Sequence, residues 1–304
     1  MKRKIVKTGQ NTLIVSLPST WVKKYHLEKG QFLELEENAG VLKIYPVEKA
    51  KKSLKIILKD EGYWYINRIL RRIYAAGYSK IEIAYSKPEQ INYIRKSVSF
   101  LDGFEVIQSK NNSCILKNIL KPEELNYRDL LEDIMWLIHS QLEIFKNSLS
   151  KGSTKDLKEI GGINNTLIKL AHLGRRILNI DCKQDVVILK DSFLLFTNLL
   201  YLSAYLNYAS EELLKKGVSL SPSEKELITE THKMYETLLY AYRNKDLQEI
   251  QNFFQKRNDT FERDNQLLEG ENPKIIHFIL NFRKEMGTIG NYFLSMSFEE
   301  KLNS

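Results

Sequence analysis

Basic side chains gather at the start of the chain, where they could neutralise the phosphates of a nucleic acid. Residues 1–59 hold 13 Lys and Arg against 5 Glu, so this segment carries the whole net charge of +8. A positive charge confined to one short segment predicts a polyanionic partner. The residues that we expect to contact phosphates or base edges of duplex DNA are Lys2, Arg3, Lys4, Lys7, Asn11, Thr12, Lys23 and Lys24.

Part of this charge has a second interpretation. Lys49, Lys51, Lys52 and Lys55 lie close together, and such a run is often a solvated linker and edge strand rather than a binding surface. Charge alone therefore does not decide between a DNA-binding module and a module with another role.

Residues typical of catalysis show no pattern that we can assign to a reaction. The sequence has neither G-x-G-x-x-G nor G-x-x-x-x-G-K-[ST] to cradle a nucleotide, and it has no G-x-S-x-G elbow. The histidines lie far apart in the sequence and show no ligand spacing; they are His26, His139, His172, His232 and His277. We therefore predict a protein that is not an enzyme and has no cofactor.

Two arginine pairs, Arg71-Arg72 and Arg175-Arg176, could bind anions. Each pair lies in a segment of helical periodicity, where arginines usually stand on the exposed face. We therefore expect all four side chains at the surface of amphipathic helices.

The length and composition are those of a globular chain with several domains. At 304 residues the chain is too long for one ordinary core, so two or three domains are expected. It has no run of about 18 apolar residues that could span a membrane, and its first residues do not form a signal peptide. Only Cys114 and Cys182 are present, which favours a reducing cytoplasm over a disulfide framework.

Short strands and one helical turn are predicted to position the basic residues. Leu13 and Val15 alternate with polar or smaller neighbours, and Pro18 opens a helical turn over residues 19–25. A second hairpin turns across Asn38-Ala39-Gly40. These elements, within residues 1–47, must hold every candidate DNA-binding residue in place.

Residues 53–120 alternate between strand and helix patterns. Strands are expected at 54–58, 81–84, 104–107 and 114–116, with helices over 63–76 and from Pro88 onward. The order βαβαββ predicts a small α+β domain with its helices over one sheet.

From Pro122 onward the pattern is helical throughout. Apolar residues recur at three- and four-residue steps, and Ser221-Pro222-Ser223-Glu224 is typical of a capping-box start. Three helices, a break at 217–221 and three further helices indicate an internal duplication. The helices are expected to about residue 149 and then over 157–179, 185–216, 222–244, 245–269 and 273–298.

Residues 3–46 resemble the swapped-hairpin domains of the AbrB/MazE/SpoVT families. The resemblance rests on Val6-Lys7-Thr8-Gly9, on Val15-Ser16-Leu17-Pro18-Ser19-Thr20-Trp21 and on Leu27-Glu28-Lys29-Gly30-Gln31. It implies that two chains interlace their hairpins and that the dimer lays basic residues on DNA. Some members place an Arg just before the Ile-Pro, where this chain has Ser16, and base-specific readout often relies on Arg. A module used only for dimerisation is therefore the alternative.

Two heptapeptides in the helical region resemble the Leu-Glu-Arg-Ile-Gly-Asp-His/Tyr motif of PhoU, the regulator of phosphate uptake. They are Leu199-Leu200-Tyr201-Leu202-Ser203-Ala204-Tyr205 and Met286-Gly287-Thr288-Ile289-Gly290-Asn291-Tyr292. In that family a Glu and an Asp four residues apart hold metal from one helix face. Here the ligand positions are Leu200 with Ala204 and Gly287 with Asn291, so we expect no metal at them.

We therefore predict a multidomain chain. A β-rich swapped hairpin spans residues 1–48 and an α+β domain of order βαβαββ spans 52–120. An all-α pair of PhoU-like three-helix bundles follows at 122–217 and 221–300.

The two resemblances also imply a function. They imply an archaeal-type cytoplasmic homodimer that binds duplex DNA and regulates transcription linked to phosphate uptake, without inserting into a membrane. A phosphate transporter ATPase or a signalling protein is the expected protein partner. The alternative is an interaction protein that modulates such a partner and uses its front module only to dimerise.

Overall fold

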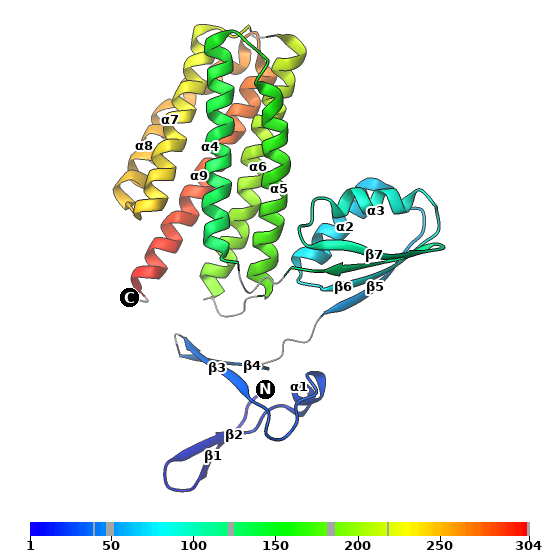
Figure 1. Ribbon diagram of the computed structural model, residues 1–304. Coiled ribbons are helices and arrows are strands. Elements are labelled where there is room, and N and C mark those ends of the chain that lie inside the picture. The colour runs from blue at the N-terminus through cyan, green and yellow to red at the C-terminus, as the bar shows by residue number, and fades with distance from the viewer. Residues whose placement is uncertain (39, 47–51, 121–124, 181–185, 218, 303–304) are drawn as a thin grey trace. The chain divides into compact units, whose positions relative to one another are not determined.

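Strand hairpins, a small α+β region and a long helical region follow one another along the chain (Figure 1). The computed structural model describes all residues except 39, 47–51, 121–124, 181–185, 218 and 303–304. The chain divides into two units, residues 1–52 and residues 53–304. This succession confirms the predicted multidomain fold class.

The first unit consists of two antiparallel hairpins with a helical turn between them. Gly9 and Gly40 have φ of +70° and +76°, the left-handed conformation that tight turns require and glycine adopts without strain. Pro18, with φ −62°, is the N-cap of the helix. The elements are β1 (Ile5–Thr8), β2 (Thr12–Val15), α1 (Ser19–Lys24), β3 (Leu33–Asn38) and β4 (Val41–Pro46).

The second unit begins with the predicted βαβαββ domain. Its four strands form one sheet in the order β5-β6-β8-β7, in which only β5 and β6 are parallel. Both helices cover the same face of the sheet (Figure 1), where Ile66 and Leu70 are fully buried. The elements are β5 (Ser53–Leu58), α2 (Tyr63–Ala75), β6 (Lys80–Tyr85), α3 (Gln90–Val98), β7 (Phe104–Lys110) and β8 (Ser113–Asn118).

The helical region contains two sets of three helices that share one apolar core. The third helices of the two sets, α6 and α9, form the most extensive helix pair, and α4 packs against α7. The buried apolar residues form one cluster that runs from Leu58 to Met296. The helices are α4 (Tyr127–Lys151), α5 (Leu157–Ile180), α6 (Val186–Lys216), α7 (Pro222–Asn244), α8 (Leu247–Gln266) and α9 (Pro273–Leu302), with a short 3₁₀ turn, η2 (Leu267–Glu269).

Local signals explain several of these helix boundaries. The predicted capping box at α7 is present, because the Ser221 hydroxyl accepts from the Glu224 N–H and the Glu224 carboxylate accepts from the Ser221 N–H. Gly217, with φ +84°, follows α6. None of the helices in the described ranges combines the length and apolarity needed to cross a lipid bilayer.

Contact between α5 and α6 depends on a glycine. Gly174 of α5 lies directly beneath the fully buried ring of Phe196 of α6. A Cβ at this position would lie 2.7 Å from Cε2 of that ring and would overlap two other ring atoms. The missing side chain therefore lets the two helices approach each other closely.

The second arginine pair is not at the surface, so that prediction was wrong. Arg176 is 2% exposed, and its Nη1 donates to the backbone oxygens of Tyr74 and Tyr78 at 2.7 and 2.8 Å. Its guanidinium also lies over the rings of Tyr74 and Phe104, with centroid distances of 4.8 and 5.2 Å. Arg176 therefore fastens α5 to the α+β domain, and Arg175 beside it is buried as well.

Candidate nucleic-acid interface

The β1–β2 ribbon carries three of the predicted DNA-binding residues. Lys7 pairs with Leu13 across the ribbon, and Thr12 pairs with Thr8 next to the turn that contains Asn11. All three candidate side chains are exposed. The ribbon therefore presents one ammonium and two neutral hydrogen-bonding groups to solvent, which is the chemistry that phosphate contacts use.

Three further basic residues lie immediately before this ribbon. Lys2, Arg3 and Lys4 form the segment that leads into β1, and each is exposed. With Lys7 they place four cationic groups within seven residues. Such a segment can bind successive phosphates by charge alone. It does not need to adopt one fixed conformation to do so.

Lys23 and Lys24 occupy the last turn of α1. Both are exposed, and the Lys24 ammonium lies 5.4 Å from the centroid of the Tyr25 ring. Cations at this end also compensate the negative end of a helix, although the effect is small. The two lysines are therefore accessible to a phosphate group.

Acidic residues stand on the second hairpin of the same unit. Glu34 pairs with Tyr45 and Glu37 with Leu42, so the two carboxylates lie on opposite faces of the β3–β4 ribbon. Both are exposed. The candidate basic groups thus lie in the segment that leads into β1, on β1 and on α1, whereas β3 carries negative charge.

The four positions that the resemblance to PhoU singles out offer few ligand atoms. Leu200 of α6 packs against the apolar core, and Gly287 of α9 is buried. A Cβ at Gly287 would lie 3.1 Å from the guanidinium of Arg257, so a cationic side chain covers this position. Ala204 offers no ligand atom, and Asn291 is exposed with only a weak amide oxygen.

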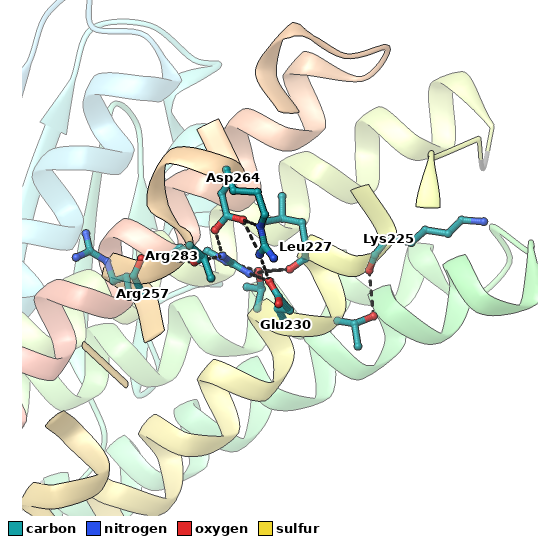
Figure 2. A network of polar contacts seen from close by, with 10 residues as sticks. Lys225, Leu227, Glu230, Arg257, Asp264 and Arg283 are labelled. Atoms are coloured by element: carbon teal, nitrogen blue, oxygen red, sulfur yellow. Dashed lines mark hydrogen bonds and ion pairs between the residues drawn. The ribbon is translucent and has the colours of Figure 1, made fainter. Parts of the chain in front are cut away.

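A buried ionic network holds α7, α8 and α9 together (Figure 2). Arg283 of α9 is paired with Asp264 of α8, and its Nη2 donates to the Leu227 backbone oxygen at 3.0 Å. Glu230 of α7 pairs with Arg263 and lies 3.5 Å from Arg283. Burial lowers the pKa of Arg283, but both carboxylates oppose this shift, so the group stays charged and paired.

Two histidines that are 93 positions apart in the sequence meet in the structure. The rings of His139 on α4 and His232 on α7 have centroids 5.0 Å apart, and Glu236 lies beside both. Their distance in the sequence therefore gave no indication that these two side chains are neighbours. The only signal in the sequence was the spacing of four residues between a His and a Glu in each helix.

Comparison with known proteins identifies the front of the chain. Residues 6–52 match the family described as antidote-toxin recognition MazE, bacterial antitoxin. The searches of curated proteins and of solved structures gave no match. The matched range contains both hairpins and α1, with the exposed basic residues Lys7, Lys23 and Lys24. The first unit is therefore a MazE/AbrB-like domain.

Proposed function

We propose that this chain is a homodimeric, non-enzymatic regulator that binds duplex DNA through its MazE/AbrB-like unit. The observation that carries the proposal is the match over residues 6–52, a segment whose candidate DNA-binding residues Lys7, Lys23 and Lys24 are exposed. The net charge of +8 resides in the first 59 residues, as expected of an electrostatic footprint for a polyanion.

The apolar residues of the same unit support dimerisation. Among the described residues of 1–52 not one is buried, and Ile5, Leu13 and Phe32 are 69%, 67% and 85% exposed. Apolar side chains occupy both faces of the β1–β2 ribbon, because Val6 pairs with Ile14 on one face and Ile5 with Val15 on the other. So short a unit needs a partner to form a core, and a second copy that interlaces its hairpins supplies one.

The helical region would receive the signal. By its resemblance to PhoU we propose a cytoplasmic regulator of phosphate uptake whose bundles contact a phosphate transporter ATPase or a signalling protein. A pocket of about 370 Å³ beside Arg283 supports a role in sensing an anion, because Arg257 and Lys284 line it and the carboxylate of Asp264 in its wall is already paired with Arg283. These cationic groups suit a phosphate-like ligand.

DNA binding is tested by fluorescence anisotropy of labelled duplex DNA with the full chain. Replacing Lys7 by Ala removes two phosphate contacts from a dimer, so the slope of log K against log salt should become less steep by about 2. Replacing Lys155, an exposed lysine of the helical region, by Ala is the matched control and should leave the slope unchanged.

The alternative is an interaction protein that dimerises through its front unit without touching DNA. Ser16 in place of an Arg and the exposed Glu34 and Glu37 favour it. A wild-type chain that sediments as a dimer but binds no duplex at low salt would establish this alternative. Equal salt slopes for the Lys7 and Lys155 variants would mean that Lys7 neutralises no phosphate.

A further inference from the structure

Helices α4 and α7 each carry a histidine followed four residues later by a glutamate. The pairs are His139 with Glu143 and His232 with Glu236. A spacing of four places both side chains of a pair on one face of the helix. Because α4 packs against α7, these faces meet. The site therefore joins the two three-helix sets and is separate from the front unit.

The ligand-type atoms of three of these residues converge. Nε2 of His139 lies 3.5 Å from Oε1 of Glu236, and Nδ1 of His232 lies 3.6 Å from Oε2 of the same carboxylate. One such atom from each residue lies within 4.8 Å of the other two. With bonds of about 2.0–2.1 Å, tetrahedral zinc ligands are about 3.4 Å apart. The two contacts to Glu236, one to each carboxylate oxygen, are already close to this value.

His232 lacks a hydrogen bond that a buried histidine usually makes. It is 3% exposed, yet its Nε2 has no hydrogen-bond partner among the described residues, although buried ring nitrogens usually have one. His139 is positioned from the other side by Trp136, whose ring meets it edge-on at a centroid distance of 5.4 Å. Arg243 in turn lies 5.0 Å from the centroid of that Trp136 ring. The two imidazoles are thus fixed in place, while Nε2 of His232 stays unpaired among the described residues.

A cation already lies at this position. The Lys146 ammonium is 3.3 Å from Nδ1 of His232. An ammonium can only donate, so Nδ1 accepts and presents the lone pair that a metal ion would take. Burial lowers the pKa of His232; the Glu236 carboxylate opposes this shift, whereas Lys146 and His139 add to it.

The charge of the cluster also favours a divalent cation. Glu236 touches both rings, and Glu143 is near enough to act on His232 electrostatically. The two carboxylates outnumber the single ammonium of Lys146, so the cluster has an excess of carboxylate charge. A dication that displaced Lys146 would turn that charge into a favourable interaction.

We propose that His139, His232 and Glu236 bind a divalent transition-metal ion of the zinc class, which replaces the Lys146 ammonium and bridges α4 and α7. Two imidazoles and one carboxylate are a common ligand set for Zn²⁺, whereas Mg²⁺ and Ca²⁺ prefer oxygen ligands. The ion would link the two halves of the helical region and would stabilise their association.

Zinc titration of the metal-free full chain tests the proposal, with isothermal calorimetry for affinity and Co²⁺ absorption for tetrahedral geometry. One ion per chain is expected. His139→Ala, His232→Ala and Glu236→Gln should each weaken binding at least roughly tenfold. His277→Ala removes an exposed histidine of α9 and should bind as the wild type does. Zinc at roughly one hundred times its Kd should raise Tm by about 5 to 10 °C.

A gain-of-affinity variant keeps the test decisive if a ligand variant fails to fold. Lys146→Met removes the competing ammonium, so it should bind Zn²⁺ more tightly than the wild type, a result that misfolding cannot produce. Unchanged affinity in Lys146→Met would place the metal elsewhere. Absence of zinc binding by the wild type, or equal affinity in the His139 and His277 variants, would overturn the proposal.

Discussion

Substituting Ala for Gly174 should destabilise the protein, although alanine is the better helix former. In the interior of a helix Gly→Ala ordinarily gains about 1 kcal/mol. Here the added Cβ would overlap the buried ring of Phe196, so the ring or the helix α5 must move. Overpacking of this kind costs about 1–3 kcal/mol, and the severity of the overlap favours the upper end. We expect a net loss of about 2 kcal/mol, or about 4 to 8 °C in Tm.

Urea unfolding followed by circular dichroism measures this effect, and the chain supplies its own control. Gly162 lies in the same helix, and a Cβ there would meet nothing within 4 Å, so Gly162→Ala should gain up to about 1 kcal/mol. Adding Phe196→Leu to Gly174→Ala should cost less than the sum of the two single changes, since the new methyl group fills part of the vacated space. A Gly174→Ala protein that is more stable than the wild type would refute the close packing of α5 on α6.

Three further outcomes follow from buried polar groups. Asp264→Asn should cost about 3 kcal/mol in urea unfolding, because Arg283 stays buried after losing its closest carboxylate; a loss under 1 kcal/mol would contradict this. In a Cys182→Ser background, Cys114 should react with a thiol reagent only after unfolding, because burial raises the pKa of its thiol to about 11. Burial, followed by the nearby arginines, lowers the pKa of His172 to about 2, so only the unfolded chain takes up this proton below pH 6.5. Stability should therefore fall by about 2 kcal/mol more between pH 7 and pH 5 in the wild type than in His172→Gln, and parallel curves would refute the assignment.

Secondary structure was largely predictable because it depends on short-range signals. The capping box at Ser221, the left-handed Gly77 after α2 and the left-handed Gly40 just before β4 are each determined by a few neighbouring residues. The periodicities of the helices and strands are equally local, and the order βαβαββ followed from them. The match over residues 6–52 agrees with the resemblance of the front segment to the AbrB/MazE/SpoVT families.

Tertiary contacts explain what the sequence did not reveal. Arg176 looks like a surface residue in a periodicity plot, and only the carbonyl oxygens of Tyr74 and Tyr78, about one hundred positions away, make its burial tolerable. His139 and His232 meet only because α4 and α7 pack together, which no local pattern encodes. The roles of the basic residues in DNA binding stay predictions, since they depend on a partner.

The core shared by the two sets of helices limits how the polypeptide can be dissected. The break near residues 217–221 looks like the natural place to cut, yet α6 before it and α9 beyond it form the largest helix contact in the described chain. Separating them would expose apolar stripes on both fragments, which would then aggregate or re-associate. A fragment intended for expression, or a junction intended for a fusion protein, therefore belongs near residue 52, where the two units divide.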